Sequence, residues 1–129
     1  MPQISFVNNN FIDRDKAFIH IEDRAFQFAD GIYEVILFKN GKLVDAKLHL
    51  NRLFDGLLKL NIKHNFLQDE IIENILELFK RNEMGEGFVY MQVSRGVVKR
   101  SQGLPQYLAP TVVMTVDEHK KFSDEDFNR

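Results

Sequence analysis

The sequence lacks cysteine altogether, and its 129 residues have a formal net charge of only -2. Without cysteine the chain can form neither a disulfide framework nor a thiolate metal site. It also has no apolar run near the length of a membrane span, so we expect a soluble protein with no membrane partner. The nearly balanced charge gives no bias toward polyanions, which argues against nucleic acid as a partner.

The start of the sequence has no secretory signal, because residues 1–5 lack a basic patch followed by an apolar stretch. We therefore expect a cytoplasmic protein. The hydrophobic content of 44% is enough for a real core, and the length suits one domain, which we place at residues 1–117. Residues 118–129 are charged and weakly patterned, so they predict a linker or a frayed tail.

Two β-hairpins are predicted in the first third of the chain. Residues 4–7 and 11–12 flank three asparagines, and asparagine tolerates the positive φ that tight turns require. Residues 32–39 are rich in branched and aromatic side chains, and residues 42–44 return after Asn40-Gly41. Asn-Gly is the strongest two-residue turn signal, so the second hairpin is the clearer of the two.

Apolar residues at helical spacing predict two helices, over residues 46–60 and 68–81. Acidic residues at the start of the second helix and basic residues at its end suit the helix dipole. Strands are predicted at residues 88–95 and 111–116. This order of elements indicates an α+β domain, with a mostly antiparallel sheet and two helices packed on one side of it.

The strand over residues 32–38 has two different faces, because alternate side chains point to opposite sides. Both faces are mostly apolar, which predicts a central strand. Tyr33 either packs in the core or aims its hydroxyl at a cleft. Glu34 points the other way, and we expect it to be a structural acid with a buried partner, Arg24 or Arg95.

Two cationic positions can receive an anion. Arg52 lies on the first predicted helix beside an apolar stripe, where its planar fork fits a phosphate or a carboxylate, or an ion pair with Asp45 or Asp55. Arg100 follows Lys99 in a loop between two predicted strands. That loop is equally consistent with an ordinary solvated surface.

Residues 21–35, IEDRAFQFADGIYEV, resemble the N-terminal motif of the fold-type IV pyridoxal-phosphate aminotransferases, and within that family the D-amino acid (D-alanine) aminotransferases. The resemblance continues through residues 49–53 (HLNRL), 94–96 (SRG) and 110–111. It implies the small α+β N-terminal domain of that family. It also implies pyridoxal 5'-phosphate as cofactor, a small amino acid and a 2-oxo acid as substrates, and a homodimer.

The resemblance implies a role for five residues. Arg52 matches the arginine that contacts the cofactor phosphate, while His49 is expected to be structural. Tyr33 and Val35 match positions in the substrate pocket. Arg100 matches an arginine of the substrate-carboxylate trap, which the family supplies across the dimer interface. Gln102 stands where the family has a histidine, so the trap keeps its charge and loses an ionisable donor.

The chain also departs from the family pattern. Ala25 and Ala29 replace usual glycines, which is tolerable where φ is negative. The lysine that holds the cofactor lies in the second half of the family's subunit, beyond Arg129, and the lysines of this sequence fall at hairpin edges, helix surfaces or loops. We therefore expect no catalytic residue here, an absent C-terminal domain, and an isolated chain without activity.

Other functions remain open. Branched-chain aminotransferase and aminodeoxychorismate lyase share the fold type, although the DGIYEV run favours the D-amino acid branch. A different class of function is a non-catalytic dimerisation or binding module that retains an anion site at Arg52.

Overall fold

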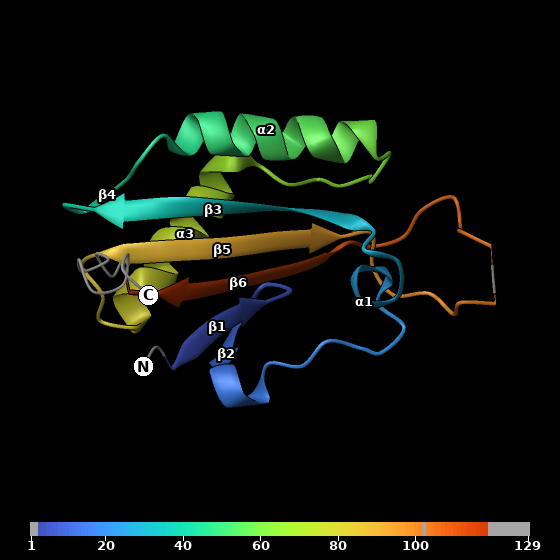
Figure 1. Cartoon of the computed structure of the whole chain (residues 1–129), viewed down its shortest axis with the longest axis horizontal. Coiled ribbons are helices and arrows are strands. Elements are labelled where there is room, and N and C mark those ends of the chain that lie inside the picture. Colours follow the sequence, from blue (N-terminus) through green and yellow to red (C-terminus); the bar gives the residue numbers. More distant parts are fainter. Residues whose placement is uncertain (1–2, 102, 119–129) are drawn as a thin grey trace, which may run out of the picture.

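The computed structural model describes residues 3–101 and 103–118. Their strands form one six-stranded sheet in the order β2-β1-β6-β5-β3-β4, and every neighbouring pair is antiparallel. The strands are β1 (Ile4–Val7), β2 (Asn10–Asp13), β3 (Gly31–Lys39), β4 (Lys42–Leu43), β5 (Gly87–Ser94) and β6 (Thr111–Asp117). The helices are α1 (Arg24–Phe28), α2 (Ala46–Lys59) and α3 (Gln68–Arg81), with a 3-10 turn η1 (Arg14–Lys16) after β2. The predicted α+β class is confirmed (Figure 1).

Both hairpin turns have the backbone conformation that their asparagines predict. Asn8 and Asn9 have φ values of 46° and 69°, and Asn40 and Gly41 have 54° and 75°. Positive φ at both central residues is typical of type I′ turns, whose twist matches that of the flanking strands. The turn residues therefore set the register of β1 with β2 and of β3 with β4.

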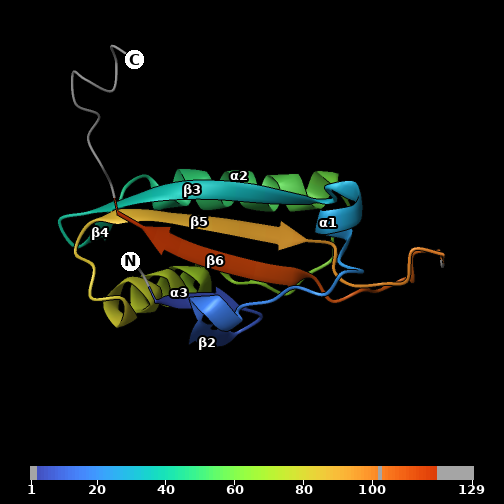
Figure 2. The same ribbon diagram turned by 60° about the horizontal axis from the view of Figure 1, so that its bottom comes forward.

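The core lies between one face of the sheet and the helices α2 and α3, which run beside and behind the strands (Figure 1, Figure 2). Phe38 of β3 stacks on Phe79 of α3 with ring centroids 4.4 Å apart. The fully buried side chains include Ile36, Leu50, Leu53, Leu57, Ile75, Leu78, Val89, Met91, Val93, Met114 and Val116. Burying each of the larger side chains contributes about 1.5–3 kcal/mol, so this layer stabilises the arrangement of helices on the sheet.

Helix α1 was not predicted from the sequence. Asp23 begins it, since its side chain accepts a hydrogen bond from the Ala25 N–H at 2.9 Å. Ala29 ends it in the left-handed conformation, with a φ of 53°. The condition of a negative φ, under which an alanine would be tolerated in place of glycine, is therefore not met at Ala29. A residue with a Cβ atom in this conformation costs about 1–2 kcal/mol, which a glycine avoids.

Strand β3 is not central, contrary to the prediction. It lies second from the edge of the sheet, and β4 pairs only with Phe38 and Lys39. No other strand pairs with the outer edge of β3 among the described residues. The sheet face opposite α2 and α3 leaves Tyr33 60% and Val35 42% exposed. The apolar character of this face indicated a buried surface, but in the described part of the chain it lies open.

The connection between β5 and β6 projects beyond the end of the sheet next to α1 (Figure 1, Figure 2). Gly96, at its start, has a φ of 117°, and a Cβ atom there would clash with the carbonyl oxygen of Ala109 at its other end. The Gly96 carbonyl also accepts a hydrogen bond from the Arg24 N–H at 2.9 Å. Only a glycine suits this position, because both its backbone conformation and its close neighbour exclude a side chain.

Candidate active site

The open face of the sheet presents a row of side chains that begins at Tyr33. In the strand register Tyr33 lies opposite Gln92 of β5, and Gln92 lies opposite Val113 of β6. The Tyr33 ring also stacks on Tyr90, with centroids 5.6 Å apart. Tyr33 and Val35 therefore share this face, as the alternation of the strand predicts.

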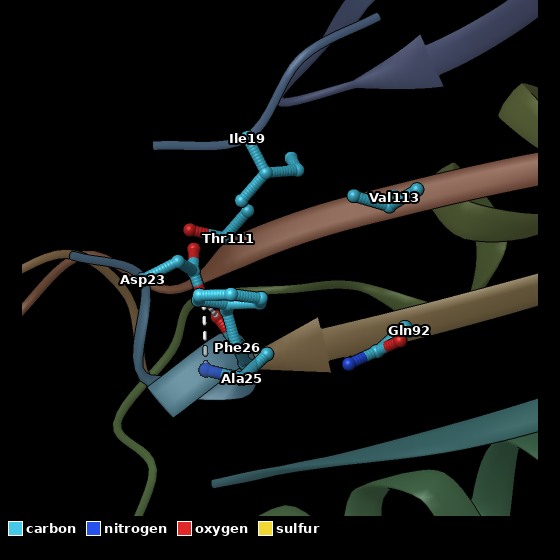
Figure 3. Close-up of a pocket in the computed structure, with 8 residues that line it drawn as sticks. Ile19, Asp23, Ala25, Phe26, Gln92, Thr111 and Val113 are labelled. Carbon is cyan, nitrogen blue, oxygen red and sulfur yellow. Dashed lines mark hydrogen bonds between the residues drawn. The ribbon is translucent and has the colours of Figure 1, made fainter. Parts of the chain in front are cut away.

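A pocket of about 280 Å³ adjoins this row beside α1 (Figure 3). In Figure 3 Gln92 and Val113 approach it from the sheet, and Asp23, Ala25 and Phe26 lie at its other end. Its lining is Ile19, Asp23, Ala25, Phe26, Gln92, Ser94, Thr111 and Val113. Since Gln92 belongs both to the pocket and to the row with Tyr33, the pocket and the predicted substrate position are continuous on one face.

Asp23 is the acidic group of this pocket, and it is fully buried. Its Oδ1 accepts hydrogen bonds from the Ala25 N–H at 2.9 Å and from the Ser94 hydroxyl at 2.7 Å. Its Oδ2 has no hydrogen-bond partner among the described residues. Asp23 belongs to the family motif, but no separate role was predicted for it from the sequence. The preference of aspartate for the position before a helix was the signal that could have located it.

Arg52 forms a two-point ion pair with Glu34. The Nε–H donates to Oε2 of Glu34 at 2.8 Å, and Nη2 donates to Oε1 at 2.7 Å. The alternative in which Arg52 pairs with Asp45 or Asp55 is therefore wrong. So is the expected pairing of Glu34 with Arg24 or Arg95. The observed partners are 18 residues apart, and they meet because α2 lies alongside β3.

The surroundings of Glu34 favour its charged form. The hydrogen bonds from Arg52 lower the pKa of the Glu34 carboxyl, burial opposes them, and His49 adds a further lowering through a 2.7 Å contact of its Nδ1. Glu34 in turn raises the pKa of Arg52. The Arg52 side chain is still 70% exposed, so the guanidinium lies between the buried carboxylate and solvent.

Arg24 and Arg95 both pair with Asp30, the residue before β3. Their Nε atoms lie 2.8 Å and 2.7 Å from its Oδ2. Burial alone would raise the pKa of Asp30, but the hydrogen bonds from Arg95 and Arg24 outweigh it and lower the pKa. Arg95 also donates to the Leu60 carbonyl at 2.6 Å. This cluster therefore joins the start of α1, the start of β3, the end of β5 and the end of α2.

Arg100 lies beside the aromatic ring of Phe28. Its guanidinium carbon is 5.6 Å from the ring centroid of Phe28, and Arg24 approaches the same ring at 4.4 Å. No hydrogen bond or ion pair joins Arg100 to Tyr33 or Arg52 in the part of the chain that the structure describes. Gln102, the other residue predicted for the carboxylate trap, lies outside the described residues.

Three further observations concern the described residues only. Every lysine among them is exposed. They contain no group of His, Asp and Glu side chains that could hold a metal ion. None of their helices has the length and apolar character needed to cross a bilayer.

Curated proteins similar in sequence include D-alanine aminotransferases. That of Listeria monocytogenes strain 10403S is 38% identical over 91 residues, covering 70% of this chain and 32% of the relative. That of Staphylococcus haemolyticus is 34% identical over 109 residues, covering 84% and 39%. The chain thus spans about a third of the length of these relatives.

Solved structures share the fold at low sequence identity. The branched-chain amino acid aminotransferase of Escherichia coli superposes with a TM-score of 0.85 at 15% identity, covering 92% of this chain and 40% of that one. The 4-amino-4-deoxychorismate lyase of Pseudomonas aeruginosa gives a TM-score of 0.74 at 20% identity, covering 96% and 43%. The family model for amino-transferase class IV matches residues 31–126, so the chain belongs to the class IV aminotransferases.

Proposed function

We propose that this chain is the N-terminal domain of a pyridoxal-phosphate-dependent D-amino acid aminotransferase, of the type that converts D-alanine and 2-oxoglutarate to pyruvate and D-glutamate. The observation that supports this most is the 33–38% identity to D-alanine aminotransferases over most of the chain. The branched-chain aminotransferase and lyase structures are only 15–21% identical, so their likeness concerns the fold.

Arg52 is proposed to hold the cofactor phosphate. Glu34 uses two of its N–H groups, so three of the five that an arginine has are left for an anion. The exposure of the side chain and its permanent charge fit a phosphate. Bound pyridoxal phosphate supplies the carbonyl carbon that receives the amino group and the ring that withdraws electrons from the substrate. The proposed role of Arg52 is to bind and orient the cofactor through its phosphate.

The substrate is proposed to bind over the open face of the sheet. Tyr33 directs its ring into the row that adjoins the pocket, where its hydroxyl can donate a hydrogen bond to the substrate carboxylate. Val35 is on the same face and limits the room for the substrate side chain. Arg100 supplies a positive charge and Gln102 an amide donor to the same carboxylate in the neighbouring subunit of a homodimer.

The lysine that holds the cofactor is proposed to lie outside this chain, so that the 129 residues alone have no transaminase activity. The exposure of every described lysine supports this, because such a nucleophile needs a buried setting. The boundary after residue 117, the linker or tail over residues 118–129 and the cytoplasmic location stay predictions. Of the tail, residues 119–129 fall outside the described residues.

The test is transamination by the gene product that contains this chain. With D-alanine, 2-oxoglutarate and pyridoxal phosphate, we expect pyruvate to form, and L-alanine and L-leucine to give little product. Activity on L-leucine instead would identify a branched-chain enzyme, and no activity would favour a binding module. Borohydride reduction of the isolated chain with pyridoxal phosphate should give no stoichiometric mass adduct, and one phosphopyridoxyl group per chain would contradict the absence of the lysine.

A further inference from the structure

Glu34 is a buried carboxylate to which the proposed function gives no role. It is 4% exposed and lies on the helix-covered face of β3, opposite to Tyr33. It accepts three hydrogen bonds, two from Arg52 at 2.8 Å and 2.7 Å and one from His49 at 2.7 Å. Burying a charged group is unfavourable unless it is paired and hydrogen-bonded, so this carboxylate depends on both of these partners.

The geometry of the pair fixes the orientation of the guanidinium. Two parallel hydrogen bonds from a planar group to a carboxylate restrict rotation as well as distance. The bonds use Nε and one hydrogen of Nη2, which lie on the same edge of the guanidinium. Nη1 and the second hydrogen of Nη2 therefore face away from Glu34. No hydrogen bond from Nη1 to another described residue accompanies them.

His49 supports the carboxylate from the same helix. It stands three residues before Arg52 on α2, so both side chains project from one helix face toward β3. Its Nδ1 and Nη2 of Arg52 meet the same oxygen, Oε1 of Glu34. The carboxylate is thus held between two donors on one helix turn.

We propose that Glu34 is a positioning residue, which holds the Arg52 guanidinium so that its outer edge is presented to the phosphate of the cofactor. This inference rests on the proposed role of Arg52. It adds that the affinity for the phosphate group depends on the two-point pair with Glu34, and not on the charge of Arg52 alone.

Positioning and simple electrostatics predict opposite results for Glu34→Gln. A carboxylate close to a phosphate repels it, so removing the negative charge should tighten phosphate binding if charge alone matters. If Glu34 positions Arg52, the same change should weaken binding, because one of the two strong hydrogen bonds is lost. Glu34→Asp keeps the charge but shortens the side chain by one methylene. Positioning predicts weaker binding for this variant too, whereas charge alone predicts no change.

The first measurement is the dissociation constant of pyridoxal divided by that of pyridoxal phosphate. This affinity ratio isolates the contribution of the phosphate, and it falls when the phosphate is held less tightly. The measurement is made on the full gene product for wild type, Glu34→Gln, Glu34→Asp and Arg52→Ala. Asp55→Asn is the matched control. It removes one negative charge from α2, the helix that carries Arg52, at a residue that pairs with Lys59. We expect the ratio to fall about tenfold in both Glu34 variants, the equivalent of about 1.4 kcal/mol, and to stay unchanged in Asp55→Asn.

The second measurement is the ¹⁵N-resolved Nε–H signal of Arg52, assigned by its loss in Arg52→Ala. In wild type it should exchange slowly with water, and in Glu34→Gln it should exchange faster even without cofactor. If Arg52→Ala lowers the affinity ratio but both Glu34 variants match or exceed wild type, the positioning role is wrong while the proposed phosphate site stands. If Arg52→Ala leaves the ratio unchanged, the proposed phosphate site is wrong, and the positioning role with it.

Discussion

Tyr33 and Glu34 are adjacent on β3, and their side chains leave the strand on opposite faces of the sheet. Tyr33 is 60% exposed and stacks on Tyr90, whereas Glu34 is buried and pairs with Arg52. One strand thus contributes both to the open face and to the ion pair with α2. A register shift of one residue would exchange the two side chains and abolish both arrangements.

Tyr33→Phe removes a hydroxyl from the open face and keeps the ring that stacks on Tyr90. In the active gene product we expect the KM for D-alanine to rise about 5- to 10-fold, because one hydrogen bond to the substrate carboxylate is lost. The affinity for pyridoxal phosphate should not change. Steady-state kinetics and a cofactor titration provide the two values, and an unchanged KM would remove Tyr33 from the carboxylate site.

Arg100→Ala should raise the KM for substrate more strongly, by about 10- to 100-fold, because a charge-assisted hydrogen bond is lost. Cofactor binding should stay close to wild type. Lys99→Ala is the control, since it removes the adjacent exposed charge of the same sign. Equal effects of the two variants would indicate a general effect of loop charge and contradict a specific contact by Arg100.

Ala29→Gly should stabilise the protein by about 0.5–1 kcal/mol. Glycine relieves the cost of the left-handed conformation at this position, although it also increases the freedom of the unfolded chain. Ala25→Gly is the matched control, because Ala25 lies inside α1, where glycine costs about 0.5–1 kcal/mol. The free energies of unfolding in urea should therefore change in opposite directions. If Ala29→Gly were destabilised, the left-handed conformation of Ala29 would not carry the energetic cost assigned to it.

Asp30→Asn should destabilise the protein on the order of 3 kcal/mol at neutral pH, because Arg24 and Arg95 lose their shared anion. The pKa of Asp30 is lowered in the folded state from its ordinary 3.8. The stabilisation from this group is therefore complete above that value and is lost as the pH falls through the lowered pKa. The difference in unfolding free energy between wild type and variant should shrink below about pH 4. A difference that is constant from pH 7 to pH 3 would contradict this account.

The elements with local signals were predicted well. Asn8-Asn9 and Asn40-Gly41 determine their turns through backbone conformation alone, and α3 has the predicted bounds. Helix α2 ends at Lys59, one residue before the predicted end. Helix α1 was missed because five residues are too few for a periodic pattern.

Side-chain partners were predicted less well, because they depend on how distant elements pack. The pairing of Glu34 with Arg52 depends on the placement of α2 beside β3, which no local pattern specifies. Asp30 lay within the family motif, but its two arginines come from α1 and from the residue after β5. That the sheet face with Tyr33 is exposed was also not predicted. Apolar residues indicate that a surface is buried, but they do not identify the element that covers it.

Gly96 and Ala109 bring the two ends of the connection between β5 and β6 close together. Because the connection between β5 and β6 leaves the sheet and returns to it at one place, residues can be inserted between these two without moving either strand. Doubling the length of such a connection costs only about 0.6 kcal/mol of closure entropy. During evolution the segment that carries Arg100 could therefore change in length and sequence, and with it the molecules that the segment recognises, while the sheet keeps its structure.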